Sequence, residues 1–248
     1  MLIRRECSLI YTLRNSQSTM DYLALIPARS GSKGIINKNI QDLNGLPLVA
    51  HTFNAALNSK LINSIYITSN DKNVISIAKK YNIQVPFVRP DYLSADASTT
   101  LDVVFHFLNW FNKENNILPK NFVLLQPTSP LRDSNDIDNA IKKFEKSNSM
   151  SLFSACKVSQ HPFEMFHLDS NESLNFFYQK YNPIQIKTRQ NYRDVFFEDG
   201  AIYICNTEWF LKNKVFYNSS SSFITLSKKH SIDIDTYEDL MLAKMYLK

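Results

Sequence analysis

A short loop near the start of the chain constrains the fold more than any other stretch. It comprises the nine residues Ile-Pro-Ala-Arg-Ser-Gly-Ser-Lys-Gly at positions 26–34 and follows an apolar run, residues 22–26, that is typical of a buried strand. The 248-residue chain contains only four glycines, and two of them, Gly31 and Gly34, lie in this loop. A chain so poor in glycine uses it where the backbone turns tightly or lies close to another group. The sequence therefore predicts a strand followed by a loop of specific backbone shape.

Positive charge surrounds these glycines. Arg29 and Lys33 lie in the loop, and Lys38 follows within an Asn-Lys-Asn sequence. Backbone N–H groups combined with fixed cations suit a polyphosphate, so the loop predicts a nucleoside triphosphate site. Neither the dinucleotide fingerprint G-x-G-x-x-G nor the P-loop G-x-x-x-x-G-K-[ST] occurs in the chain. An ordinary strand-to-loop turn with surface cations is the alternative.

The composition fits one domain without nucleic-acid or membrane partners. We expect residues 20–248 to form a single domain and residues 1–19 to lie outside the core, either because Met20 is the natural start or because they form a loosely held extension. A net charge of +5 without a basic stripe argues against nucleic acid, and no apolar run approaches the length of a membrane span. Three cysteines without metal or redox spacing are typical of a reducing compartment such as the cytoplasm.

Strand-like and helix-like patterns alternate along most of the chain. The predicted strands are 22–26, 64–69, 85–88, 122–125, 151–156 and 200–205. The predicted helices lie within 47–60, 71–81, 99–111 and about 137–144, with a last helix from 237 onward. Thr99 with Asp102 and Thr236 with Asp239 have the spacing of helix capping boxes. This alternation predicts a mostly parallel sheet covered by helices on both faces, with ligands at the carboxyl ends of the strands.

Residues 161–198 break the alternation. They lose clear apolar periodicity and are rich in phenylalanine and tyrosine among polar residues. Aromatic enrichment is typical of protein interfaces, so the segment is interpreted as a β-rich excursion that packs against another subunit. An irregular cap over the ligand site is the alternative.

Two further segments carry polar groups that suit a ligand site. Asp233 and Asp235 have i, i+2 spacing in an extended segment, which places both carboxylates on one face and could hold a divalent cation. Helix capping by Asp235 or Thr236 is the alternative. Gln126 opens a proline-stiffened connection that ends at Arg132, which as a purely local turn would leave Arg132 at the surface.

Two more groups of residues are less informative. Arg89 precedes a proline at another strand end and suits either a phosphate contact or a surface salt bridge. The five histidines show no ligand spacing, and no Ser-His-Asp or Cys-His pattern supports a nucleophilic hydrolase.

Three separated motifs resemble the acylneuraminate cytidylyltransferases, or CMP-sialic acid synthetases, whose relatives activate legionaminic and pseudaminic acids. These motifs are residues 26–34 with Lys38-Asn39, residues 126–132, and the Ser-Ile-Asp-Ile-Asp-Thr sequence at 231–236. Weaker matches at 89–96, 154–162, 189–190 and 200–203 follow the family order. The resemblance implies a Rossmann-like α/β/α fold in a cytoplasmic homodimer. It also implies a reaction of CTP with a nine-carbon 2-keto sugar acid that gives CMP-sugar and pyrophosphate for surface glycans, with Mg²⁺.

The motif matches also imply roles for particular residues. The nucleotide would be held by Arg29, Ser30, Lys33, Lys38, Asn39, Arg89 and Thr100. The sugar would be contacted by Gln126, Arg189 and Gln190, with Arg189 often supplied by the partner subunit, and the metal would be bound by Asp233 and Asp235. The expected catalytic residues are Arg29, Lys33 and Asp235, because attack on the α-phosphorus depends on positioning and on neutralising the phosphate charge.

The sequence departs from the sialate-specific members at two positions near the sugar. Glu164 stands where these members carry a basic residue after the His-Pro pair, and Phe197 stands where they carry a second arginine. A legionaminic-type sugar therefore competes with N-acetylneuraminate as the substrate. A sugar nucleotidyltransferase of the ketodeoxyoctonate type and a nucleotide-binding module without catalysis are the competing functions.

Overall fold

A six-stranded mixed sheet forms the centre of the computed structural model, which describes residues 21–177 and 192–247. Its strands are β1 (Tyr22–Pro27), β4 (Ser64–Thr68), β5 (Asn121–Leu124), β6 (Ser151–Lys157), β9 (Phe196–Asn206) and β10 (Ser222–Thr225). The strand order is β10-β6-β9-β5-β1-β4, and every neighbouring pair is parallel except the two pairs that include β9. The predicted mostly parallel sheet is confirmed.

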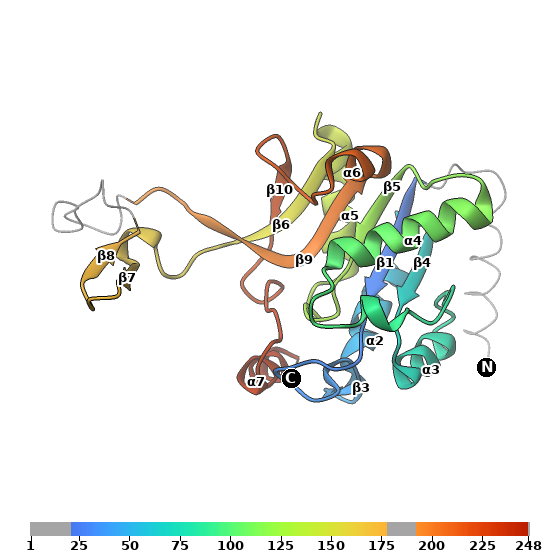
Figure 1. Ribbon diagram of the computed structural model, residues 1–248, viewed down its shortest axis with the longest axis horizontal. Coiled ribbons are helices and arrows are strands. Elements are labelled where there is room, and N and C mark those ends of the chain that lie inside the picture. The colour runs from blue at the N-terminus through green and yellow to red at the C-terminus, as the bar shows by residue number, and fades with distance from the viewer. Residues whose placement is uncertain (1–20, 178–191, 248) are drawn as a thin grey trace.

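Helices cover both faces of this sheet (Figure 1). The helices α2 (Leu48–Asn58), α3 (Lys72–Lys80) and α5 (Ser134–Lys146) pack on one face, and α4 (Thr100–Asn115) and α6 (Thr207–Asn213) pack on the other. Alternate residues of β1 serve the two apolar cores, since Ala24 and Ile26 lie in the first and Leu23 and Leu25 in the second. Burial on both faces explains the continuous apolar run in the sequence. The three-layer α/β/α class is confirmed.

A third, smaller apolar cluster lies beneath the ligand-site loops. It joins Ile35 of the glycine loop, Leu131 of the turn after β5, and Ile234 to Leu240 and Ala243 of the last helix, α7 (Tyr237–Tyr246). The 3₁₀ turn η1 (Lys38–Ile40) and the small hairpin of β2 (Asp42–Leu43) and β3 (Leu46–Pro47) lie between the glycine loop and α2. This cluster brings three segments that are far apart in sequence to one end of the sheet.

The described residues between β6 and β9, namely 158–177 and 192–195, form an arm that projects from the body of the molecule (Figure 1). Its described part contains the 3₁₀ turn η3 (Pro162–Glu164) and a hairpin of β7 (Phe166–Leu168) and β8 (Leu174–Phe176). Several of its large apolar side chains, including Phe166, Leu168 and Leu174, are more than half exposed. A two-stranded hairpin of this size buries too little surface to be stable alone. The arm therefore contains the β structure expected for residues 161–198 and an uncovered apolar surface.

Three details differ from the sequence-based expectation. The strand predicted at 85–88 is wrong, because the described backbone forms only isolated bridges there, between Tyr66 and Gln84 and between Ser69 and Val88. Pro86 lies between them and has no N–H to give to a strand ladder. The helix α6 and the strand β10 were not predicted, because α6 has only seven residues and β10 follows a serine run. The 3₁₀ turn η2 (Asp91–Leu93) was likewise not predicted.

Two further predictions concern chain ends and membranes. The expected extension at residues 1–19 and the proposed start at Met20 lie outside the described residues. Within the described ranges, none of the helices is both long enough and apolar enough to cross a bilayer.

Candidate functional site

A pocket of about 320 Å³ opens at the carboxyl ends of the central strands. Its wall is built from the glycine loop, the start of α4, the turn after β5 and the segment before α7. Eight residues predicted for the site line it: Arg29, Lys33, Lys38, Asn39, Arg89, Thr100, Gln126 and Asp235. Residues separated by up to about 200 positions therefore meet where ligands bind in sheets of this type.

The two glycines of the loop serve the two purposes expected of glycine there, namely a tight turn and a close approach of the backbone to another group. Gly31 has a φ of +74°, in the left-handed region that disfavours other residues. Gly34 lies against the backbone of the last motif, where an added Cβ would stand 2.1 Å from the carbonyl oxygen of Asp235. Gly31 therefore turns the loop, and Gly34 lets it approach the segment that carries the predicted metal ligands.

Asp96 bridges the two cations of the loop. Its Oδ1 lies 3.0 Å from Nη1 of Arg29, and its Oδ2 lies 3.0 Å from Nζ of Lys33. The Arg29 guanidinium also donates to the carbonyl of Ser94 at 3.1 Å. Hydrogen bonds from Lys33 and then Arg29 hold the pKa of Asp96 below its ordinary value. The sequence associates Asp96 with the site only through a weak family match, because pairing between residues far apart along the chain has no local signal.

Lys38 and Asn39 join the glycine loop to neighbouring segments of the site. The Lys38 amine is nearly buried and donates to the carbonyl of Ile234 at 2.7 Å and to Oδ1 of Asp235 at 2.8 Å. The Asn39 amide donates to the carbonyl of Arg29 at 2.9 Å. Both side chains line the pocket, and both also fix the relative positions of its walls.

Arg89 is buried at the floor of the pocket. Only 3% of it is exposed, and it donates to the hydroxyl of Thr68 at 3.1 Å and to its carbonyl at 2.6 Å. Burial, and to a smaller extent the charge of Arg29, lowers the pKa of Arg89 to about 10. The alternative of a surface salt bridge is wrong for this residue, and its position fits the expected nucleotide contact.

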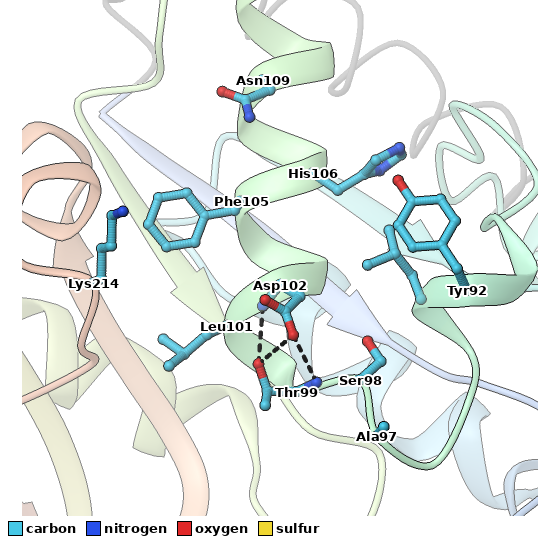
Figure 2. Close-up of a pocket in the computed structure, with 11 residues that line it drawn as sticks. Tyr92, Ala97, Ser98, Thr99, Leu101, Asp102, Phe105, His106, Asn109 and Lys214 are labelled. Carbon is cyan, nitrogen blue, oxygen red and sulfur yellow. Dashed lines mark hydrogen bonds between the residues drawn. The ribbon is translucent and has the colours of Figure 1, made fainter.

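The amino-terminal end of α4 also faces the pocket, through Ser98, Thr99 and Thr100. Figure 2 shows the capping box that fixes this end, in which Thr99 Oγ1 accepts from the Asp102 N–H at 3.2 Å and Asp102 Oδ2 accepts from the Thr99 N–H at 2.9 Å. The predicted cap is confirmed. The positive end of the helix dipole is thereby aimed at the side of the pocket where an anion would lie.

A larger hollow of about 810 Å³ runs along the outer side of α4 (Figure 2). Its lining includes Tyr92, Phe105, His106, Asn109 and Lys214, and it shares Leu93, Ser98 and Thr99 with the smaller pocket. Among the described residues that line it, none is a predicted phosphate-binding cation. The smaller pocket is therefore the better candidate for the nucleotide.

The turn after β5 is held by a buried arginine. Arg132 is 2% exposed and donates to the carbonyl of Gln126 at 3.0 Å, to the carbonyl of Ala201 at 2.7 Å and to Oγ1 of Thr52 at 2.6 Å. Burial lowers its pKa to about 10. The alternative of a surface position for Arg132 is wrong, and its role is to set the backbone of Gln126. The Gln126 amide lies against Gly200 of β9, where an added Cβ would stand 3.6 Å from its Nε2.

The two carboxylates of the last motif lie on the side opposite Ile234. Ile234 is fully buried and its N–H donates to the carbonyl of Thr128 at 2.7 Å, while Asp233 and Asp235 are exposed. Asp235 lines the pocket, and Asp233 does not. Thr236 is the residue that caps α7, which leaves the Asp235 carboxylate available to the pocket. The alternating burial fits the expected common face, and joint binding of a cation by the two carboxylates stays a prediction.

This pair suits a hard divalent cation. Partial desolvation raises the pKa of Asp233 and the Asp235 charge adds to the effect, while a hydrogen bond from Thr128 opposes it. A bound cation relieves the repulsion between two neighbouring carboxylates. Mg²⁺ also prefers oxygen ligands, which both side chains supply. The residues present therefore fit the ion.

A second acidic group has a structural explanation. Among the described residues, one set of three ligand-type side chains lies close together, namely Asp133, Asp136 and His230. Asp133 and Asp136 form the capping box of α5, and the His230 ring lies 2.7 Å from the Asp136 carboxylate. These contacts account for the group without a metal.

Besides Asp233, three predicted site residues are not part of the described pocket wall. Ser30 does not line the pocket, and instead exchanges hydrogen bonds with Asn70, whose Oδ1 accepts from the Ser30 N–H at 2.9 Å. Arg189 and Gln190 lie outside the described residues. Asn70 was not predicted for the site.

Comparison with known proteins places this pocket in a family context. Residues 23–246 match the family described as cytidylyltransferase. Among characterised relatives, a pseudaminic acid cytidylyltransferase of Campylobacter jejuni is 33% identical over 92% of this chain and 97% of its own length. A CMP-N,N'-diacetyllegionaminic acid synthase of Legionella pneumophila is 32% identical with the same coverage. An N-acylneuraminate cytidylyltransferase of Escherichia coli is 33% identical over 89% of this chain. The match covers 51% of that longer protein.

Solved structures agree at the level of the fold. A CMP:2-keto-3-deoxy-manno-octonic acid synthetase in complex with CTP superimposes with a TM-score of 0.67 at 13% identity, covering 92% of this chain and 98% of that one. A 4-diphosphocytidyl-2C-methyl-D-erythritol synthase of Anaerococcus prevotii gives a TM-score of 0.62 at 15% identity, covering 93% and 99%.

Proposed function

The chain belongs to the cytidylyltransferase family, and we propose that it transfers CMP from CTP to a nine-carbon 2-keto sugar acid of the sialic or legionaminic type, releasing pyrophosphate. The observation that carries this proposal is the pocket in which Arg29, Lys33 and Asp235 converge. The relatives named for nonulosonic acids cover almost the whole chain, which supports the substrate class.

The pocket supplies the groups that this reaction needs. The anomeric hydroxyl of the sugar forms the new bond to the α-phosphorus, while the bond to the departing pyrophosphate breaks and the hydroxyl proton is lost to solvent. Arg29 and Lys33 neutralise the phosphate charge that develops, and the nucleotide is positioned by Lys38, Asn39, Arg89 and Thr100, which line the pocket. Ser30, which lies outside the pocket wall and pairs with Asn70, would act on the nucleotide only through the shape of the loop. Positioning and electrostatics account for most of the catalysis in such transfers.

The remaining predicted residues act on the metal and the sugar. Asp233 and Asp235 would hold Mg²⁺, which when bound supplies further charge neutralisation at the phosphates. Gln126 would contact the sugar from the end of β5, and Arg189 and Gln190 would contact it from the segment between β8 and β9.

The choice of sugar is proposed to depend on the arm rather than on the nucleotide loop. Glu164 and Phe197 lie on or next to the arm, and they replace basic residues expected in sialate-specific enzymes. Loss of two cations disfavours a sugar that relies on them for its carboxylate or its acceptor groups. A legionaminic-type acid therefore remains a competitor of N-acetylneuraminate as the substrate.

Pyrophosphate release from CTP tests the proposal directly. The full chain is assayed with Mg²⁺ against N-acetylneuraminate, legionaminic acid derivatives, pseudaminic acid and ketodeoxyoctonate, with UTP and ATP as nucleotide controls. We expect release with CTP and a nine-carbon acid. Release only with ketodeoxyoctonate would support that type of transferase, and CTP binding without release would support a non-catalytic module.

We also propose that the enzyme is a cytoplasmic homodimer. The exposed apolar side chains of the arm need a covering surface, and a second copy would supply one and could contribute Arg189 to the site. Cys156 and Cys205 are free, buried thiols, which suit a reducing compartment. Sedimentation of the full chain at micromolar concentration should give twice the mass of one chain.

A further inference from the structure

A buried carboxylate on β9 connects the sugar side of the pocket to the predicted metal ligands. Asp199 is 3% exposed and accepts hydrogen bonds from three groups. The donors are the Ser154 hydroxyl of β6, the Ala201 N–H of β9 at 3.1 Å, and the Ser231 hydroxyl at 2.7 Å. Ser154 and Ser231 are themselves buried. The contact between Asp199 and Ser231 joins β9 to a segment 32 residues further along the chain.

Ser231 is the first residue of the motif that carries Asp233 and Asp235. The middle of this segment is anchored by the Ile234 N–H, which donates to the Thr128 carbonyl at 2.7 Å. Its end is anchored by Lys38, which contacts the Asp235 carboxylate at 2.8 Å. The bond from Ser231 to Asp199 is therefore an upstream anchor for the two carboxylates.

Asp199 lies on β9 directly before the residues that contact Gln126 and Arg132, so its bond to Ser231 connects these parts of the site. Gly200 follows it and faces the Gln126 amide, and the Ala201 carbonyl then accepts a hydrogen bond from the buried Arg132. One carboxylate thus ties the strand that supports Gln126 to the segment that carries the metal ligands. The ionised carboxylate suits this place because it only accepts hydrogen bonds, whereas an amide would present N–H groups to at least one donor.

We propose that Asp199 is a positioning residue for the transfer reaction. Acting through Ser231, it fixes the segment that carries Asp233 and Asp235 relative to the strand that supports Gln126, so that the two carboxylates would be held in place for a divalent cation. This inference rests on the proposed function, because it assigns the cation to that pair of carboxylates. Removing a residue that orients a metal ligand without binding the metal itself typically lowers metal affinity by one to two orders of magnitude.

Two serine variants separate this role from simple stabilisation. Ser231→Ala removes the donor that reaches the metal-binding segment. Ser154→Ala removes a donor from the same carboxylate on the opposite side, and it also removes an acceptor from the Ile202 N–H at 2.8 Å. Ser154→Ala should therefore lower the thermal midpoint at least as much as Ser231→Ala. Ser231→Thr keeps the hydroxyl and serves as the rescue variant.

Mn²⁺ binding to the protein–CTP complex, followed by electron paramagnetic resonance, gives a readout independent of turnover. We expect Ser231→Ala to weaken Mn²⁺ binding about tenfold. Ser154→Ala and Ser231→Thr should remain within about twofold of the wild type, and the Mg²⁺ concentration for half-maximal pyrophosphate release should follow the same order.

The result that overturns the inference is equal Mn²⁺ affinity in Ser231→Ala and Ser154→Ala, whether both weaken or neither does. A wild type that binds Mn²⁺ with CTP but releases no pyrophosphate would contradict the proposed function alone, and the serine variants would still test the positioning role. A wild type that binds no Mn²⁺ would contradict both.

Discussion

Asp96 shows how a single residue can compete with the substrate of its own site. Its carboxylate spans the Arg29 and Lys33 side chains, the groups proposed to hold the phosphates. Each contact with Asp96 uses N–H donors and positive charge that a triphosphate would also use, so we expect the two anions to compete. The Asp96 side chain is 54% exposed, so we expect a bound triphosphate to displace it from these cations.

Asp96→Asn should therefore lower the KM for CTP by about two- to fivefold, because an exposed ion pair is a weak competitor. The inhibition constant of pyrophosphate should fall in parallel, since both anions use the same cations. Asp91→Asn is the matched control, because it also removes one negative charge from the segment before α4. Within the described part of the chain, the Asp91 carboxylate forms no ion pair with Arg29 or Lys33. Steady-state kinetics at low ionic strength would contradict this competition if Asp96→Asn raised the KM.

Asp235→Ala should reduce turnover by about two orders of magnitude or more while leaving the fold intact. The side chain lines the pocket, is 72% exposed and does not cap α7, so its loss affects the site rather than the core. Turnover with Mg²⁺ and the circular dichroism spectrum are measured together. Glu238→Ala, an exposed acid in the first turn of α7, is the control. Near-normal turnover in Asp235→Ala would remove Asp235 from the mechanism.

The raised pKa of Asp233 predicts a pH dependence with a defined sign. A carboxyl that binds its proton more tightly in the folded state opposes folding once the pH exceeds its ordinary pKa of about 3.9. Asp233→Asn should therefore raise the thermal midpoint of the metal-free protein at pH 7 and leave it unchanged at pH 3. The rise should be only about 1–2 °C, because solvent screens an exposed carboxylate. Calorimetry at the two pH values measures this difference, and a lower midpoint at pH 7 would contradict the assigned shift.

At the scale of elements, the pocket depends on how closely the glycine loop approaches the segment before α7. Lys38 joins the two through the Ile234 carbonyl, and Gly34 meets the Asp235 carbonyl directly. Ile35 and Ile234 lie in the same apolar cluster beneath them. The segments proposed to hold the phosphates and the metal are thus parts of one packed unit, although 196 positions separate Lys38 from Ile234.

Gly34→Ala should push the glycine loop away from the segment before α7, because its Cβ would lie 2.1 Å from the backbone carbonyl oxygen of Asp235. A backbone oxygen cannot avoid the clash by a side-chain rotation. We expect a loss of turnover of more than about tenfold, together with weaker CTP binding. Gly31→Ala is the control, because no described atom lies within 4 Å of its added Cβ. Only the strain of its positive φ, about 1–2 kcal/mol, should then appear in the free energy of unfolding. Equal turnover in the two variants would contradict the close-approach argument.

At the scale of the whole molecule, the proposed nucleotide site lies in the body, whereas residues proposed to select the sugar lie on or next to the projecting arm. The cations and the carboxylates belong to the body, whereas Glu164 and the exposed apolar hairpin belong to the arm (Figure 1). An arm of this kind gains stability only by packing on another surface. This is why assembly and sugar specificity are expected to change together.

Leu174→Glu should shift the proposed dimer toward the monomer, because it places a charge on the exposed apolar face of β8. Sedimentation equilibrium measures the shift, and turnover with the sugar should fall while CTP binding is retained. Ile117→Glu, at an exposed apolar position after α4 in the body, is the control. A Leu174→Glu protein with unchanged mass and unchanged turnover would contradict the arm-mediated dimer.

Local sequence patterns were enough to predict the α/β fold class and the glycine loop, whereas Asn39 and Thr100 were assigned to the pocket only through the family resemblance. Apolar runs with helical or alternating period indicate the sheet and its covering helices, because burial on one or two faces leaves that pattern in any sequence. Two glycines and three cations in and beside one loop predicted a phosphate site, and the structure has Gly31 turning and Gly34 in close approach. Each of these signals lies within a short stretch of chain, so it can be recognised before the chain is folded.

Contacts between distant residues became visible only once the chain was folded. The bridge from Asp96 to Arg29 and Lys33, the burial of Arg89 and Arg132, and the anchor from Asp199 to Ser231 each join segments that are unrelated along the sequence. The strand predicted at 85–88 was wrong for a different, local reason, because Pro86 has no N–H to donate to a strand ladder. Pairing across the fold depends on how elements pack and not on residue spacing, so no local pattern records it.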